Sequence, residues 1–229
     1  MDSNKSFSEV VRAFLIPGQV SVLGITGQAG AGKTTFIASL AAGVAQEEGF
    51  ATDSLGLDAF FKLSSSGRKE WIKEGHEISP EEGAFRSDQV NWWDFGDAQK
   101  ALEMLKRGEP IHLTNVYNRE DEGELTGEVM IHPPDGGMLL VFEGVAVAHL
   151  DCMDALMYVH APSAVRFERL SERDKERRGR EEALGRFELT QAFETQYFPQ
   201  YWDKITCFVD NSQQYPQVLG CMKHEIALT

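Results

Sequence analysis

The chain has 229 residues, of which 42% are hydrophobic; this is enough for one sizeable core, so we expect a single domain over residues 1–229. Its formal net charge of −14 would repel a phosphate backbone, which argues against a nucleic-acid polymer as partner. No apolar run approaches the roughly 20 residues of a membrane span, and the first residues lack the pattern of a secretory signal. We therefore expect a soluble, cytoplasmic protein without a membrane partner.

The first predicted strand, Val20–Thr26, is a continuous apolar run typical of parallel sheets covered on both faces. A glycine-rich turn follows, and apolar residues then recur at helical spacing from Thr34 to Gly49, where a helix is expected to end. Further strands are predicted at Thr52–Leu57, Leu139–Phe142, Ala155–His160 and Ile205–Val209, and helices at Asp97–Arg107, Ala164–Lys175 and Glu182–Phe198. This alternation predicts an α/β fold with a parallel sheet.

Two segments do not fit the alternation. Leu63–Asn91 is rich in Ser, Gly and Glu, and Val116–Gly137 is rich in Gly, Asp, Glu and Pro. Long irregular segments inside a compact domain are often functional loops. We therefore expect substrate loops at about residues 58–95 and 115–137.

The turn after the first strand has the sequence GQAGAGKT and matches the phosphate-loop pattern G-x-x-x-x-G-K-[ST] without a mismatch. Glycines let backbone N–H groups wrap a phosphate at the positive end of the following helix. Lys33 is expected to reach the β and γ phosphates, and Thr34 to bind magnesium. The predicted nucleotide-binding residues are Gly27, Gln28, Ala29, Gly30, Ala31, Gly32, Lys33, Thr34 and Thr35. The same loop serves GTPases, motors and kinases, so it does not by itself name the reaction.

Four further segments resemble the uridine kinase and phosphoribulokinase group of small-molecule kinases, and the resemblance covers the chain from about Val20 to Asp210. They are LDAFFK from Leu57, DQVNWWDF from Asp88, LLVFEGV from Leu139, and VRFERLSERDKERRGR from Val165. The resemblance implies a three-layer α/β/α P-loop NTPase fold with a mainly parallel five-stranded sheet and an arginine-bearing lid at about residues 166–186. It also implies ATP and Mg²⁺ as cofactors and a small-molecule hydroxyl substrate.

In the first of these segments, the resemblance makes Asp58 the residue that orients or deprotonates the accepting hydroxyl, with Phe61 beside the substrate. A base within hydrogen-bond reach of that hydroxyl suits in-line transfer. An aspartate that only caps the turn after a strand is the alternative. In the second segment, Asp88 would hold substrate hydroxyls and Asp94 would cap the next helix, although Trp92 and Trp93 could simply pack in the core.

In the third segment, four apolar residues precede Glu143 and a glycine follows it, as at the end of a buried strand that opens onto the site. By the resemblance, Glu143 would bind the magnesium ion or its waters. A glutamate at a strand end that faces solvent is the alternative.

The fourth segment follows the family pattern without a gap. On a helix, Arg166, Arg169 and Arg173 share one face, which could close over the triphosphate. Guanidinium groups there would neutralise charge on the transferred phosphoryl group. The resemblance favours Arg169 and Arg173 as catalytic residues and Arg178 as a nucleotide-binding residue; a solvated helix with Arg–Glu pairs is the alternative.

The resemblance is weakest where the substrate would be recognised. The uridine kinase pattern has a tyrosine–aspartate pair, then a histidine and an arginine, whereas the segment VYNREDE from Val116 keeps only the tyrosine. Tyr117 and Arg119 could still face a planar or anionic substrate group, or could anchor a surface loop.

The leading hypothesis is an ATP-dependent kinase for a nucleoside, sugar or related alcohol. A regulatory GTPase or mechanical ATPase is less favoured, because the chain has no N-K-x-D segment and no apolar strand that ends in Asp-Glu. A nucleotide-binding module that docks to a protein partner is a third hypothesis. The phosphate acceptor, GTP as an alternative donor, and assembly into a homo-oligomer stay open at this point.

Overall fold

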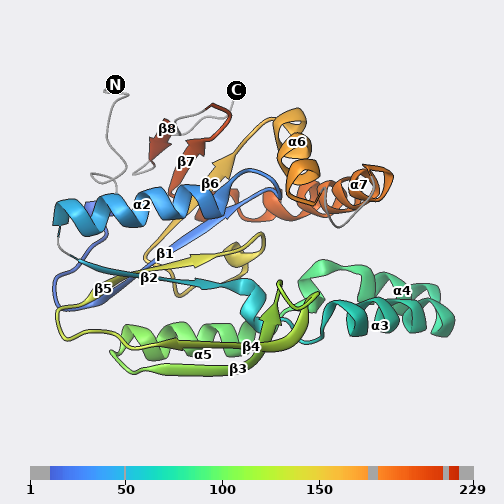
Figure 1. Ribbon diagram of the computed structural model, residues 1–229, viewed down its shortest axis with the longest axis horizontal. Coiled ribbons are helices and arrows are strands. Elements are labelled where there is room, and N and C mark those ends of the chain that lie inside the picture. Colours follow the sequence, from blue (N-terminus) through green and yellow to red (C-terminus); the bar gives the residue numbers. More distant parts are fainter. Residues whose placement is uncertain (1–10, 49, 175–179, 214–216, 222–229) are drawn as a thin grey trace.

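The computed structural model describes residues 11–48, 50–174, 180–213 and 217–221. Its main sheet has the strand order β2-β5-β1-β6-β7-β8 (Figure 1). The strands are β1 (Val20–Gly27), β2 (Ala51–Gly56), β5 (Met138–Glu143), β6 (Ala155–His160), β7 (Cys207–Asp210) and β8 (Gln217–Cys221). The first five run parallel, which confirms the predicted sheet, and β8 adds an unexpected antiparallel strand beside β7.

Helices cover both faces of this sheet (Figure 1). Helix α2 (Lys33–Glu48) lies on one face, and α5 (Phe95–Lys106) lies on the other together with the hairpin of β3 (Ile111–Asn118) and β4 (Glu124–Ile131). Helices α6 (Ser163–Asp174) and α7 (Arg180–Tyr197) lie beyond the end of the sheet at which β1 leads into α2. The predicted three-layer α/β/α arrangement is therefore confirmed.

Side chains of the central strands point alternately to the two faces of the sheet, and both faces are buried. In β5, Leu140 and Phe142 pack toward α5, whereas Leu139 and Val141 pack toward α2. Because both faces are covered, the strand reads as a continuous apolar run rather than an alternating one. Among the helices of the described part of the chain, none is long and apolar enough to cross a membrane.

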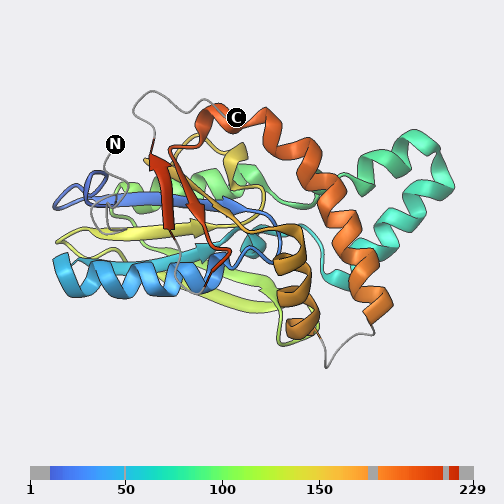
Figure 2. The same cartoon turned by 90° about the horizontal axis from the view of Figure 1, so that it is seen from above.

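The prediction of irregular structure is wrong for the first segment, Leu63–Asn91. This segment forms α3 (Ser65–Ile78) and α4 (Pro80–Ser87), which pack on each other and project from the body (Figures 1 and 2). Ser64 caps α3 by accepting a hydrogen bond from the Gly67 N–H, and Ser79 caps α4, which starts with proline. These helices escaped detection because a helix pair that projects from the body needs only a narrow apolar stripe.

The prediction of irregular structure is also wrong for most of the second segment, Val116–Gly137. The antiparallel hairpin of β3 and β4 occupies it, and the register shifts between Thr114 and Val116 and again between Val116 and Asn118. Asn115 has a positive φ of 56°, which is uncommon outside glycine. These irregularities interrupt the alternation by which a hairpin is recognised in a sequence.

The carboxyl ends of three adjacent parallel strands meet at one edge of the sheet. In register, Ile25 of β1 and Gly56 of β2 both lie beside Glu143 of β5. Ligands of open parallel α/β sheets bind in the crevice outside this edge. The fold therefore places the residues that follow β1, β2 and β5 around one crevice.

Replacing Leu140 by Ala tests this two-faced core. Its side chain has no exposed surface, so we expect a loss of about 2–5 kcal/mol in the free energy of unfolding, measured by urea denaturation. Met130→Ala is the control, because Met130 on β4 is 54% exposed and should change stability by less than about 0.5 kcal/mol. Equal losses in the two variants would contradict the assigned core.

Candidate functional site

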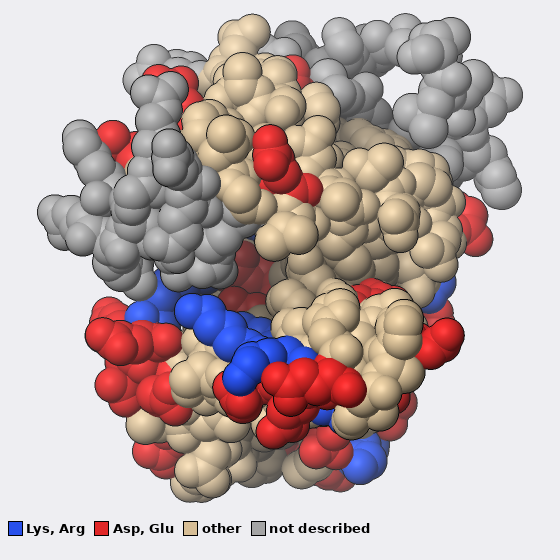
Figure 3. Space-filling view, turned by 90° about the vertical axis from the view of Figure 1, so that its right-hand side faces the viewer, with Lys and Arg blue, Asp and Glu red and all other residues tan. Residues whose placement is uncertain are grey.

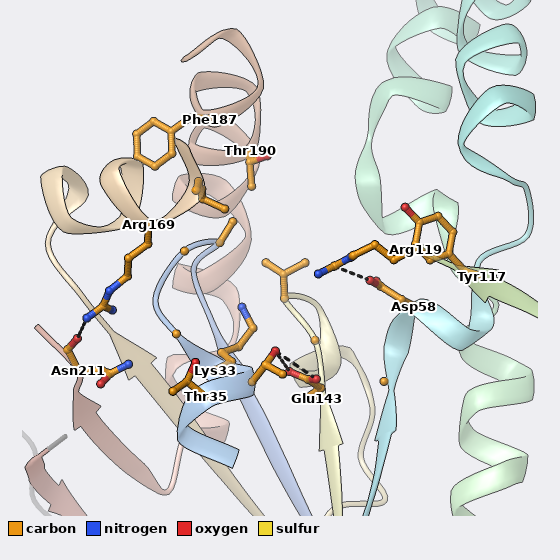
Figure 4. A pocket seen from close by; sticks show the side chains of 18 of the residues that line it. Lys33, Thr35, Asp58, Tyr117, Arg119, Glu143, Arg169, Phe187, Thr190 and Asn211 are labelled. Carbon is orange, nitrogen blue, oxygen red and sulfur yellow. Dashed lines mark hydrogen bonds and ion pairs between the residues drawn. The ribbon is translucent and has the colours of Figure 1, made fainter. Parts of the chain in front are cut away.

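A pocket of about 1010 Å³ opens at the edge where the strands end. One part is lined by the phosphate loop and the start of α2, including Gly30, Lys33 and Thr35. The other part is lined by Asp58, Tyr117 and Arg119, and Glu143 lies between the two (Figure 4). We call these parts the loop end and the Asp58 end.

The loop end requires glycine at specific positions. Gly30 has a φ of +78°, and a Cβ atom there would lie 2.5 Å from the backbone oxygen of Arg166. Gly32 has a φ of +87°, and its Cβ would lie 2.4 Å from the Asn211 side chain. Both backbone strain and contact therefore exclude larger residues at these positions.

Lys33 is the first residue of α2, and its side chain bends back over the loop. Its ammonium group donates hydrogen bonds to the backbone oxygens of Gly27, at 2.8 Å, and Gln28, at 3.2 Å. The N-terminus of α2 faces the same space, so the backbone N–H groups of its first turn and an ammonium converge there. This combination suits a polyphosphate.

Glu143 and Thr34 lie together between the two ends, as the metal-site prediction requires. The Thr34 hydroxyl donates to the Glu143 carboxylate at 3.2 Å. Burial raises the pKa of Glu143, and the nearby charge of Lys33 opposes that rise. A hydroxyl and a carboxylate are hard oxygen donors, so the pair fits Mg²⁺. The described residues contain no cluster of three or more His, Cys, Asp or Glu that could bind a metal, so phosphate oxygens and water would have to complete the shell.

Asp58 lies in the short 3₁₀ helix Leu57–Phe60 that directly follows β2. Its side chain is 47% exposed, and Arg119 Nη2 lies 3.8 Å from Asp58 Oδ2. Loss of solvent around the carboxylate raises the pKa of Asp58, and the charges of Arg119, Lys33 and Arg68 oppose this rise. Asp58 is thus a carboxylate with raised proton affinity that remains open to the pocket.

Aromatic rings form the wall behind Asp58. Tyr117 lines the pocket, whereas Phe61 is not among the lining residues and packs against Tyr117 with ring centroids 5.1 Å apart. Phe61 also stacks on Trp93 at 5.2 Å. Phe61 therefore supports the wall, and its direct contact with a substrate stays a prediction.

Asp88 is not brought to the pocket. Its carboxylate accepts a hydrogen bond from the Val90 N–H and caps the 3₁₀ helix Gln89–Trp92. The spacing of the two aspartates instead reflects two caps, because Asp94 caps α5 by accepting from the Asp97 N–H, as predicted. The structure gives no support to a substrate role for Asp88.

Of the predicted lid residues, Arg169 lines the loop end (Figure 4). It donates to the backbone oxygens of Ala31, at 3.2 Å, and Asn211, at 2.8 Å. Arg173 belongs to α6, but its side chain lies outside the described residues, as does Arg178 altogether. The arginine-bearing lid therefore stays a prediction.

Arg166 faces the phosphate loop, as Arg169 does, but its side chain is buried, with only 2% exposed. Arg166 Nη1 donates to Glu194 Oε2 of α7 at 3.2 Å and to the Ala29 backbone oxygen at 3.2 Å. Glu194 Oε1 accepts from the Ala29 N–H at 2.5 Å. The pair therefore holds both backbone polar groups of one phosphate-loop residue, and we call it the loop clamp.

Glu194 and Asn211 were missed by sequence reasoning. Asn211 donates to the Ala31 backbone oxygen at 2.7 Å, and it directly follows β7. A polar residue directly after a parallel strand is a signal that could have found Asn211. Glu194 lies within a helix, 165 positions from Ala29, and no local pattern marks it.

Comparisons with known proteins agree with this geometry. A family model described as the Phosphoribulokinase / Uridine kinase family matches residues 22–201. The curated proteins contain no match to the chain.

Several solved structures share the fold. A protein assigned as a fructose transport system kinase from Silicibacter sp. TM1040 aligns with a TM-score of 0.63 and 18% identity, covering 84% of this chain and 95% of that one. D-glycerate 3-kinase from Cryptococcus neoformans var. grubii aligns with a TM-score of 0.61 and 12% identity, covering 94% and 100%. Phosphoribulokinase from Rhodobacter spheroides aligns with a TM-score of 0.60 and 13% identity, covering 84% and 70%.

The loop clamp can be tested with paired variants. Glu194→Met leaves the Arg166 guanidinium buried without its carboxylate, so we expect a loss of about 3–5 kcal/mol in unfolding free energy. Arg166→Met/Glu194→Met removes both charges and should recover most of that stability. The double variant should still bind an ATP analogue about tenfold or more weakly, because the Ala29 N–H and oxygen lose their partners. Wild-type affinity in the double variant, measured by calorimetry, would contradict the positioning role.

Proposed function

The chain belongs to the phosphoribulokinase / uridine kinase family, and we propose that it is an ATP- and Mg²⁺-dependent kinase that transfers the γ-phosphate to a hydroxyl of a small metabolite. The observation that carries this proposal is that one pocket joins the phosphate loop to Asp58. We also propose that residues 1–229 act as one kinase domain.

The loop end would bind the triphosphate. The backbone N–H groups of the first turn of α2 would donate to the phosphate oxygens together with those of the loop, apart from the Ala29 and Ala31 N–H groups, which bond Glu194 and Gln28. Lys33 would leave its two backbone acceptors and follow the charge that develops on the transferred group. The backbone N–H groups are held in place before the reaction, so only Lys33 has to change its hydrogen bonds.

The Asp58 end would bind the acceptor. The hydroxyl oxygen forms a bond to the γ-phosphorus as the bond from that phosphorus to the bridging oxygen breaks, and ADP leaves with the electron pair. The hydroxyl proton passes to the Asp58 carboxylate. A base with raised proton affinity suits this step, and the open side of Asp58 gives the hydroxyl access.

Thr34 and Glu143 would hold the magnesium ion. When bound, Mg²⁺ neutralises charge on the β- and γ-phosphate oxygens. Glu143 lies between Lys33 and Asp58 (Figure 4), and the charges of both act on its pKa, so its carboxylate would hold the ion at the centre of the site.

We propose that residues 166–186 act as a lid that closes over the triphosphate. Arg169 already lies at the loop end, and Arg173 and Arg178 would join it on closure, with Arg178 on the nucleotide. Closure would exclude water, which competes with the acceptor hydroxyl for the phosphoryl group.

Asp58→Asn tests the acceptor role. The purified protein is incubated with ATP and Mg²⁺, and ADP release is followed across nucleosides, sugars, polyols and hydroxy acids. We expect acceptor-dependent release that falls about 100- to 10,000-fold in Asp58→Asn, while ATP still binds. Asp53→Asn is the control, because Asp53 is an exposed aspartate on the preceding strand. Release that ignores the acceptor, or binding without turnover, would favour a hydrolase or a docking module instead.

The pH dependence of the rate supplies a second test. Asp58 accepts a proton only when ionised, and its pKa is raised above 3.8, so the rate should fall as the pH drops through a midpoint above 3.8. The residual rate of Glu143→Gln should keep this acidic limb, whereas that of Asp58→Asn should lose it. A midpoint at or below 3.8, measured with protein that regains full activity at neutral pH, would contradict Asp58 as the base.

A further inference from the structure

We infer that the acceptor carries an anionic group, a carboxylate or a phosphate, close to its reacting hydroxyl, and that Arg119 binds this group. The inference rests on the proposed kinase function and narrows its substrate class from any small alcohol to an anionic one.

Arg119 is placed to contact an acceptor. It directly follows β3, lines the Asp58 end of the pocket and extends over Asp58 (Figure 4). Its Nη2 atom lies 3.8 Å from Asp58 Oδ2, beyond hydrogen-bond distance. Within the part of the chain that the structure describes, its guanidinium donates no hydrogen bond. A guanidinium has five N–H donors in a planar fork, so most of its binding capacity faces the pocket.

Positive charge reaches Asp58 from three side chains, because Arg119, Lys33 and Arg68 each lower its pKa. Arg68 does not itself line the pocket. Its guanidinium stacks over the Phe61 ring at 4.0 Å, and it donates to the Leu63 backbone oxygen at 3.3 Å. Lys33 acts on both carboxylates of the site, because its charge also lowers the pKa of Glu143. An anion beside Arg119 would therefore be attracted by positive charge from more than one side chain.

These cations lie in a chain with a net charge of −14. Figure 3 shows a band of Lys and Arg side chains along one edge of a hollow, with Asp and Glu side chains around the band and also inside the hollow. The acidic residues of the turn after Arg119 do not line the pocket. Glu120 and Glu122 are exposed, and the Asp121 carboxylate accepts from Thr126.

Guanidinium and anion match in geometry as well as charge. A carboxylate or phosphate accepts two parallel N–H bonds from one arginine, which a lone hydroxyl cannot do. Arg119 and Asp58 are 3.8 Å apart, and each reaches about 3 Å to its partner. The hydroxyl and the anionic group would therefore lie only a few bonds apart on one small molecule.

A different role for Arg119 is to bind the γ-phosphate of the donor. The two roles predict different kinetics. An arginine on the acceptor anion discriminates between anionic and neutral acceptors, whereas an arginine on the γ-phosphate affects all acceptors equally. The test therefore compares acceptors that share a carbon chain and differ in whether one end carries a hydroxyl, a carboxylate or a phosphate.

The experiment uses matched sets of probes: glycerol, D-glycerate and glycerol 3-phosphate, and ribitol, ribonate and ribitol 5-phosphate. Binding is measured by calorimetry with Mg²⁺ and a non-hydrolysable ATP analogue, and turnover by ADP release. We expect at least one anionic probe to bind about tenfold or more tightly than its neutral partner. The carboxylate and phosphate arms identify which anion is preferred.

In Arg119→Met, that anionic preference should fall by about 10- to 100-fold, and Arg119→Lys should restore only part of it, because lysine keeps the charge but not the fork. Arg107→Met is the matched control, since Arg107 is also about half exposed, at 56%, and is paired with one carboxylate, Glu109. It should leave the preference unchanged.

The inference is overturned if no anionic probe binds more tightly than its neutral partner, or if Arg119→Met weakens all probes equally. Failure of the kinase proposal looks different, because ADP release would then not depend on any acceptor. Acceptor-dependent release with neutral compounds alone would preserve the kinase and refute the anionic acceptor.

Discussion

The loop clamp is the interaction on which the rest of the site depends. Arg166 and Glu194 are almost completely buried, and their mutual attraction offsets the cost of removing both charges from water. The pair also fixes the position of the phosphate loop, because it bonds both the N–H and the backbone oxygen of Ala29. Since Arg166 belongs to α6 and Glu194 to α7, the clamp also joins the phosphate loop to the two helices that the predicted lid, residues 166–186, overlaps. A change in the loop on nucleotide binding would be felt directly by both helices.

Three acidic side chains near the loop share one electrostatic condition. Burial raises the pKa values of Asp58, Glu143 and Glu194, so each carries a negative charge where the surroundings disfavour it. Such charges cost stability, and groups with perturbed pKa values are typical of functional sites. The role of Glu194 is structural, because its carboxylate holds Ala29 and Arg166. Asp58 and Glu143 instead face the pocket, where a proton and a cation, respectively, would relieve the cost.

The sequence predicted those parts of the site that are continuous along the chain. The loop from Gly27 to Thr34 and the strand that ends in Glu143 have local patterns, because phosphate binding and buried parallel strands each impose one. Glu194 and Asn211 could not be found in this way, because their roles come from contacts with residues 165 and 180 positions distant. The helices α3 and α4 had readable caps at Ser64 and Ser79, but little apolar period to support them. Asp88 caps a 3₁₀ helix outside the pocket, so the spacing it shares with a family is also explained by a cap, and its substrate role stays a prediction.

The proposed kinase would carry the phosphoryl group from nucleotide to acceptor directly, within one pocket. Phosphorus NMR of a complete reaction is the most direct test, because every phosphate can be counted. With the preferred acceptor, we expect one phosphorylated acceptor for each ADP and no accumulation of inorganic phosphate. Inorganic phosphate equal to ADP, with the acceptor unchanged, would contradict the claim and indicate hydrolysis.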